Sequence, residues 1–139
     1  MARLSNFPSC FFLALSHLCE FIEDCEFTKL AVRILYVLGI DGPTTSQPSK
    51  YIRYIYNRVI LENATVRAAA VSSLARYAVT LPDLRVNIKV LLTRCWDDVE
   101  DEVRDRAIFY LTLLEDMGEG DVGTWKDYVA NGEYLLKMF

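Results

Sequence analysis

Few side chains in this sequence could serve as nucleophiles, general bases or metal ligands. The chain has one histidine, His17, and four cysteines, Cys10, Cys19, Cys25 and Cys95. A cysteine beside a histidine can act as a nucleophile when the two side chains are within hydrogen-bond reach. Side chains on one helix face one another at spacings of three or four residues. Cys10 precedes His17 by seven residues and Cys19 follows it by two, so we predict no catalytic pair there.

The cysteine spacings also fail to match the common metal and redox motifs. Successive cysteines are nine, six and seventy residues apart, and no C-x-x-C is present. A chain of 139 residues can bury a core without disulfides, so we interpret the cysteines as reduced thiols of a cytosolic protein. The acidic run at 100–102 lies at an expected helix start and has no isolated partner. We therefore predict no catalytic residue, no metal, no cofactor and no enzymatic activity.

One segment matches a nucleotide-binding motif by letter only. Residues 118–123 read G-E-G-D-V-G, which fits G-x-G-x-x-G. In dinucleotide-binding proteins that motif follows a β-strand and opens a helix whose backbone N–H groups face a pyrophosphate. Here the segment follows a predicted helix, and Glu119 and Asp121 would repel phosphate. We interpret it as an exposed loop.

The overall charge argues against a nucleic-acid partner. The net charge is −4 and the pI about 5.0, whereas nucleic-acid-binding domains are usually basic. Residues 50–58 do interleave basic and aromatic side chains, a pattern that can suit nucleic acids or anionic membranes. We interpret this segment instead as an amphipathic helix with Tyr56 inside. Its remaining long side chains are then expected toward solvent or a neighbouring repeat: Lys50, Arg53, Tyr54 and Arg58.

Hydrophobic periodicity predicts six helices and no segment of the ~20 apolar residues that a membrane span needs. The expected helices cover about 10–23, 26–38, 50–61, 64–79 and 84–95, and a sixth carries the acidic residues of 97–102 at its start and ends near 117. Gly39 is expected to end the second helix, Ser49 to cap the third, and Asn63 or Thr65 to cap the fourth. The triplet 63–65 also fits an N-glycosylation site, but a cytosolic location favours the capping interpretation.

A Val-Arg pair preceded by polar residues occurs twice and indicates a structural repeat. Val103-Arg104 follows Val66-Arg67 by 37 residues, and Leu30 lies 36 residues before Val66 as a looser copy. This period is typical of helix-pair repeats. We therefore predict an all-α fold, an α-solenoid of about three HEAT/armadillo-like hairpins. The expected divisions are an irregular lead-in at 1–13, the helical repeats at 14–117, and a loop with a weakly ordered tail at 118–139.

The two matching arginines suggest how neighbouring repeats are joined. Arg67 and Arg104 occupy equivalent positions, and Glu62, Asp98 and Glu100 lie near the expected turns. We predict that these side chains form a ladder of ion pairs along the solenoid. Such a ladder is structural, and a single exposed pair typically contributes less than about 1 kcal/mol.

Long stretches of the sequence resemble the trunk of the coatomer gamma subunit family. The matching words lie at 17–27, 48–58, 61–71 and 102–107, and the resemblance extends from about His17 to Leu114. Residues 1–13 look unlike the family, and the tail after Glu115 resembles it only vaguely. The family subunit is several times longer, so the resemblance implies that this chain corresponds to a later segment of the trunk.

The resemblance implies a non-catalytic scaffold in the COPI vesicle coat, which serves Golgi-to-ER and intra-Golgi protein transport. The partners it implies are other coatomer subunits, including the small coat subunit, and an Arf-type GTPase at the cytosolic face of the Golgi membrane, where the coat is peripheral. It implies no nucleic-acid partner. Two alternatives remain open: a trunk segment of a clathrin-type adaptor large chain, and a stand-alone HEAT-like interaction scaffold.

Overall fold

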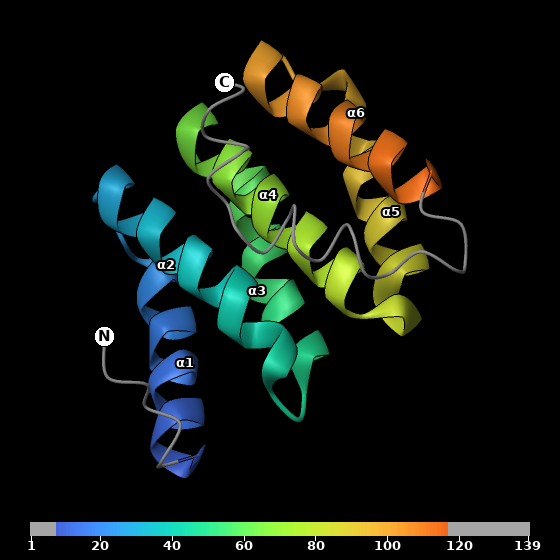
Figure 1. Cartoon of the computed structure of the whole chain (residues 1–139). Coiled ribbons are helices and arrows are strands. Elements are labelled where there is room, and N and C mark those ends of the chain that lie inside the picture. The colour runs from blue at the N-terminus through green and yellow to red at the C-terminus, as the bar shows by residue number, and fades with distance from the viewer. Residues whose placement is uncertain (1–7, 117–139) are drawn as a thin grey trace.

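A computed structural model of the chain describes residues 8–116, and these residues form six α-helices in three consecutive hairpins (Figure 1). The helices are α1 Pro8–Glu23, α2 Thr28–Asp41, α3 Pro48–Leu61, α4 Ala64–Thr80, α5 Arg85–Thr93 and α6 Asp101–Asp116. Short 3₁₀ helices follow α2 at Gly42–Thr44, precede α5 at Pro82–Leu84 and follow it at Arg94–Asp97. Within this part of the chain no strand occurs, and the predicted all-α class is confirmed.

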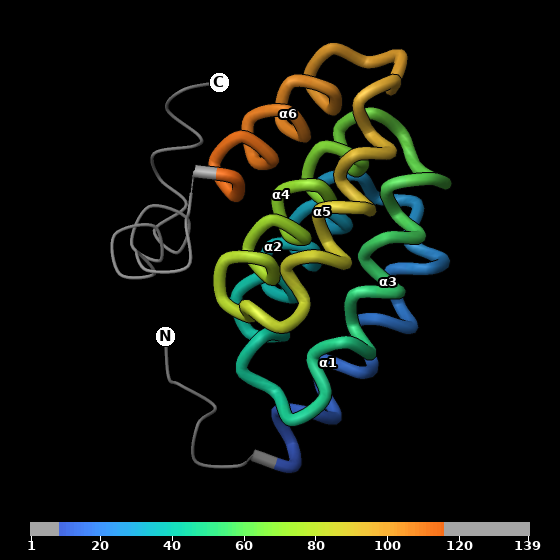
Figure 2. Tube along the Cα trace, turned by 90° about the vertical axis from the view of Figure 1, so that its right-hand side faces the viewer, coloured from blue at the N-terminus to red at the C-terminus, as the bar shows by residue number. Residues whose placement is uncertain are grey.

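The hairpins stack as a short solenoid with two layers of helices. Helix α4 packs against α2 on one side and α6 on the other, while α3 and α5 cover its inner face. Helices α1 and α3 contact each other in the second layer, and Figure 2 shows the two layers from the side. Each helix pair therefore buries one face against the next pair, as the repeat period predicts.

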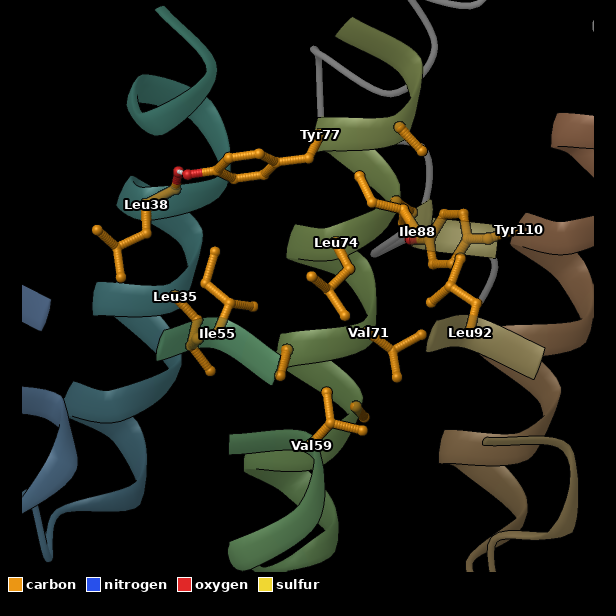
Figure 3. Packing of buried hydrophobic residues seen from close by; sticks show 14 of the residues in the cluster. Leu35, Leu38, Ile55, Val59, Val71, Leu74, Tyr77, Ile88, Leu92 and Tyr110 are labelled. Carbon is orange, nitrogen blue, oxygen red and sulfur yellow. Dashed lines mark hydrogen bonds between the residues drawn. The ribbon is translucent and has the colours of Figure 1, made fainter. Parts of the chain in front are cut away.

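Helix α4 is the centre of the core. Eleven of its 17 residues are buried, including four alanines, whose small side chains allow neighbouring helices to approach closely. Figure 3 shows Leu74 and Tyr77 of α4 between Leu38 of α2 and Leu92 of α5. Complete burial of a leucine side chain typically contributes about 1.5–3 kcal/mol. The largest fully buried side chains are Tyr77, Leu15, Ile22, Leu35, Leu38, Ile55, Leu74, Ile88, Leu92 and Leu114.

The first helix begins earlier than the predicted division at residue 13. Helix α1 starts at Pro8, so residues 8–13 belong to the helical repeat and not to an irregular lead-in. Proline suits the first helical position because the N–H it lacks would have no partner there. Phe11 is partly buried against the core and Leu15 is fully buried, so the apolar face crosses the predicted boundary.

Two predicted helix ends differ from the structure. Gly39 does not end α2, which continues to Asp41. A Cβ atom at Gly39 would lie 3.1 Å from Ser73 of α4, so this glycine serves a close helix–helix contact instead of a cap. Ser49 does not cap α3, because Pro48 already occupies the first turn and Gln47 is the N-cap residue.

Two large apolar residues, one on α2 and one on α3, lie at the surface. Leu30 is 41% exposed and Ile60 is 59% exposed. On α2, Ile34 and Leu38 lie four and eight residues after Leu30 and are buried, so Leu30 alone lies at the edge of the buried face. The buried residues of α2 are Ala31, Ile34, Leu35, Leu38 and Gly39. An α-helix has 3.6 residues per turn, so residues four apart shift gradually around the helix axis. The first residue of such a series can therefore lie at the edge of the buried face.

Candidate functional site: a polar ladder across the hairpin turns

A row of charged side chains connects the three hairpins at the ends of their helices. At its first step, Arg58 of α3 is only 5% exposed and reaches the end of α1. Its Nη1 donates to the carbonyl oxygens of Ile22 at 3.4 Å and Glu23 at 3.2 Å. The same nitrogen donates to Oε1 of Glu62 at 2.7 Å, which supplies the counter-charge. Arg58 therefore satisfies the carbonyl groups at the C-terminal end of α1, which lack partners within that helix.

The second step joins the middle hairpin to the last one. The Nε and Nη2 atoms of Arg67 donate to the two carboxylate oxygens of Asp98 at 3.1 and 2.9 Å. Arg67 Nη1 also donates to the Glu62 carbonyl oxygen at 2.8 Å. Both side chains of the pair are about five-sixths buried, at 16% and 14% exposure. A bidentate arginine–carboxylate pair fixes orientation as well as distance, so it holds the two turns in register.

Arg104 repeats the role of Arg67 one hairpin later. Its Nη1 donates to the Asp98 carbonyl oxygen at 2.9 Å, much as Arg67 donates to the Glu62 carbonyl. Its other terminal nitrogen pairs with Asp101, whose side chain is 82% exposed. The predicted pairing of Arg67 with Asp98 is therefore confirmed, but the other predicted acids differ. Arg104 pairs with Asp101, and the Glu62 carboxylate pairs with Arg58, a residue the sequence pattern did not place in the ladder.

Glu100 has no side-chain role in the ladder. Only its backbone takes part, because its N–H donates to Oδ1 of Asp98 at 3.0 Å. Asp98 therefore accepts bonds from two sources at the turn before α6. Opposing influences set its pKa: burial alone would raise it, but the bonds from Arg67 and from the Glu100 N–H outweigh burial and hold the pKa below its usual range.

The lowered pKa of Asp98 predicts an acid-sensitive contribution to stability. The contribution is fully present above the unfolded-state pKa of about 3.9 and is lost as the pH falls through the lower folded-state pKa. We expect the difference in unfolding free energy between the wild type and Asp98→Asn to shrink on acidification below about pH 4. Urea unfolding of both proteins at several pH values from neutral to acidic measures this difference. A difference that stays constant over that range contradicts the prediction.

Asn63, one of the two residues predicted to cap the fourth helix, is the N-cap residue of α4. Its Oδ1 accepts from the Val66 N–H at 3.1 Å, and its Nδ2 donates to Thr28 Oγ1 of the preceding hairpin at 3.0 Å. We expect Asn63→Ala to destabilise the chain by about 1 kcal/mol, the typical value for a lost cap. Thr65→Ala, at an exposed position two residues later, is the matched control. Thermal unfolding measures the two effects. If Asn63→Ala and Thr65→Ala lower the stability equally, the capping role is excluded.

His17 and three of the cysteines lie in different environments. His17 is exposed and its Nδ1 lies 3.7 Å from the Glu20 carboxylate. Cys10 is exposed on the same helix, while Cys19 is buried. Burial raises the pKa of the Cys19 thiol to about 12 and that of the Cys95 thiol to about 11, so both are protonated near neutral pH. These buried thiols pack in the core as small apolar groups.

The basic and aromatic segment at 50–58 divides between core and surface. Tyr51 and Ile55 are buried, Tyr56 is partly buried, and Arg58 contacts the neighbouring hairpin. This arrangement confirms the amphipathic-helix interpretation. Beside the exposed Lys50 lies an open surface hollow of about 680 Å³ between the end of α1 and the start of α3. The hollow is lined by Glu23, Gln47, Ser49, Lys50, Arg53, Tyr54 and Asn57.

Three further features concern metal ligands, membrane-spanning helices and the C-terminal segment. Within residues 8–116, no group of three or more His, Cys, Asp or Glu side chains is placed to hold a metal ion. No helix in the same residues is long and apolar enough to cross a lipid bilayer. The G-x-G-x-x-G segment at 118–123 and the tail lie outside the described residues, so the loop interpretation stays a prediction.

Comparison with known proteins identifies the family of these stacked hairpins. The family model described as "Adaptin N terminal region" matches residues 3–117, which include all six helices. The chain belongs to the adaptin family. The match begins within the segment at 1–13 that we predicted to be unlike the family, which agrees with the early start of α1 at Pro8. No solved structure matches the chain.

Among adaptin-related proteins, this chain is similar to coatomer gamma subunits. It is 64% identical to coatomer subunit gamma of Arabidopsis thaliana over 81% of its length, and 64% identical to coatomer subunit gamma-1 of Bos taurus over 88%. A 136-residue match to coatomer subunit gamma-1 of Oryza sativa is 58% identical and covers 98% of the chain. The predicted coatomer gamma resemblance is confirmed. The chain spans only 12%, 13% and 15% of the lengths of these relatives.

Proposed function

We propose that this chain is a scaffold segment of a COPI coat subunit that acts in Golgi-to-ER and intra-Golgi protein transport. Its identity to coatomer gamma subunits over most of its length is the observation that carries the proposal. The ladder supports a mechanical role, because bidentate and carbonyl contacts fix the angle between successive hairpins. A scaffold works through such fixed geometry, and its outer helix surfaces stay available for partners.

The proposed partners are other coatomer subunits, with the small coat subunit and an Arf-type GTPase as the finer candidates. In this proposal the chain is located on the cytosolic side of Golgi membranes and coated vesicles, as a peripheral component. It catalyses no reaction and needs no cofactor. The chain spans only 12% and 13% of the lengths of two of its relatives, so a whole subunit is expected to have further partner contacts outside it.

A chimera tests the proposal. The matching segment of Bos taurus coatomer subunit gamma-1 is replaced by the corresponding residues of this chain, and the tagged chimera is expressed in bovine cells. We expect it to co-purify with the other coat subunits and to appear on Golgi membranes by fluorescence imaging. A second chimera carries Arg67→Ala and Asp98→Ala, which break the ladder. The proposal fails if the first chimera is soluble and folded but does not assemble with the coat.

A further inference from the structure

One buried arginine lacks the counter-charge that the other buried arginines have. Arg76 of α4 is only 8% exposed. Its guanidinium carbon lies 4.5 Å above the ring centre of Tyr36 on α2. Its Nε atom is buried and has no hydrogen-bond partner. Among residues 8–116 no carboxylate forms an ion pair with it, whereas Arg58 pairs with Glu62 and Arg67 with Asp98.

An unpaired buried cation is energetically unfavourable. Burying a charged side chain without a partner is strongly unfavourable unless the charge is compensated. Burial lowers the pKa of Arg76, although the neighbouring Tyr36 and Tyr110 act in the opposite direction. Arginine stays protonated at neutral pH even so. Tyr36 offers a cation–π contact and a side-chain hydrogen bond, both of which are weaker than a carboxylate pair. The site therefore has an unused capacity for one anionic group.

Two further cations lie on the same helix as Tyr36. Lys29, Arg33 and Tyr36 are spaced four and three residues apart, so they form one stripe along the helix, and all three are exposed. Neither Lys29 nor Arg33 forms an ion pair within the described residues. On the opposite side of α4, Arg106 is already engaged, because it donates to Ser72 at 3.2 Å and pairs with Glu102. Around α4, the cation on the α6 side is therefore already paired, whereas Arg76, Lys29 and Arg33 have no ion pair within the described residues.

We propose that this surface, the α2–α4 face formed by Lys29, Arg33, Tyr36 and Arg76, docks an acidic protein segment whose carboxylate pairs with Arg76. The exposed Lys29 and Arg33 would attract the segment, and Tyr36, which is 46% exposed, would pack against its apolar atoms. Few cations and a net charge of −4 disfavour an extended polyanion such as nucleic acid. This inference does not depend on membership of a vesicle coat.

A peptide-binding experiment on the full chain tests the proposal. The probe is a fluorescein-labelled peptide of repeated Glu-Glu-Leu, and its counterpart has glutamine for every glutamate. We expect the glutamate peptide alone to raise the fluorescence anisotropy, and Arg76→Gln to weaken binding by about 30-fold or more. Arg53→Gln on α3 is the control and should bind as the wild type does. Lys29→Gln with Arg33→Gln should weaken binding moderately and reduce its salt dependence.

Stability separates a docking role from a structural one. Because Arg76→Gln removes an unpaired buried charge, we expect it to unfold at the same urea concentration as the wild type or at a higher one. The proposal is overturned if the glutamate peptide does not bind, if the glutamine peptide binds equally, or if Arg76→Gln binds unchanged. It is also overturned if phosphatidylserine vesicles bind through Arg76 while the peptide does not, since the anion would then come from lipid.

Discussion

Replacing Asp98 with alanine is expected to lower the free energy of unfolding by about 2–4 kcal/mol, because the change leaves a largely buried arginine without its carboxylate. Arg67 loses both bonds to Asp98 and keeps only the Glu62 carbonyl. The Glu100 N–H also loses its acceptor at the start of α6. Urea unfolding followed by circular dichroism at neutral pH measures the effect.

The neighbouring pair supplies the control for this prediction. Asp101→Ala makes the same chemical change three residues later, but the Asp101 side chain is 82% exposed, so its loss should cost less than about 1 kcal/mol. In a double-mutant cycle, Arg67→Ala combined with Asp98→Ala should be less destabilised than the sum of the single variants. If Asp98→Ala and Asp101→Ala lower the free energy of unfolding equally, the buried Arg67–Asp98 pair stabilises the chain no more than an exposed ion pair does.

Gly42→Ala is expected to destabilise the chain by about 1–3 kcal/mol or more, through a clash with α4. A Cβ atom at Gly42 would lie 1.7 Å from the Tyr77 hydroxyl oxygen and 2.7 Å from Cζ. That hydroxyl donates to the Leu38 carbonyl at 3.1 Å, and Tyr77 is fully buried, so the ring cannot move without losing this bond and its packing. Thermal unfolding of the variant is the measurement.

Two comparisons test whether the clash is the cause. Gly39→Ala places its Cβ 3.1 Å from Ser73, and alanine favours a helix by about 0.5–1 kcal/mol over glycine. Its net effect should therefore be much smaller than that of Gly42→Ala. Adding Tyr77→Phe to Gly42→Ala removes the closest atom and should cost less than the two separate changes together. If Gly39→Ala is the more damaging variant, the steric explanation is wrong.

The helices and their pairing could be predicted because they depend on local patterns. Apolar residues at helical spacing and the 37-residue separation of Val66 and Val103 indicate stacked hairpins without any knowledge of contacts. The pairing of Arg67 with Asp98 could also be anticipated, since equivalent positions of stacked repeats lie above one another.

The features that sequence reasoning missed depend on residues far apart in the chain. Gly39 has the local signature of a helix end, but its role is set by Ser73 on another helix. Arg58 has the signature of a surface cation, but its partners include the end of α1, 35 and 36 residues away. Arg76 gives no local sign of burial, because its exposure is decided by the helices on either side of α4.

The shared position of α4 has a consequence for how the chain opens. Its buried residues contact both the preceding and the following hairpin, so neither hairpin can detach without exposing part of α4. In stacked repeats, opening proceeds through the loss of interfaces between nearest neighbours. Amide hydrogens of α4 should therefore exchange with solvent only when the structure opens as a whole, while α1, which contacts mainly α2 and α3, can open by itself. Helix α4 therefore determines how cooperatively the stacked hairpins unfold.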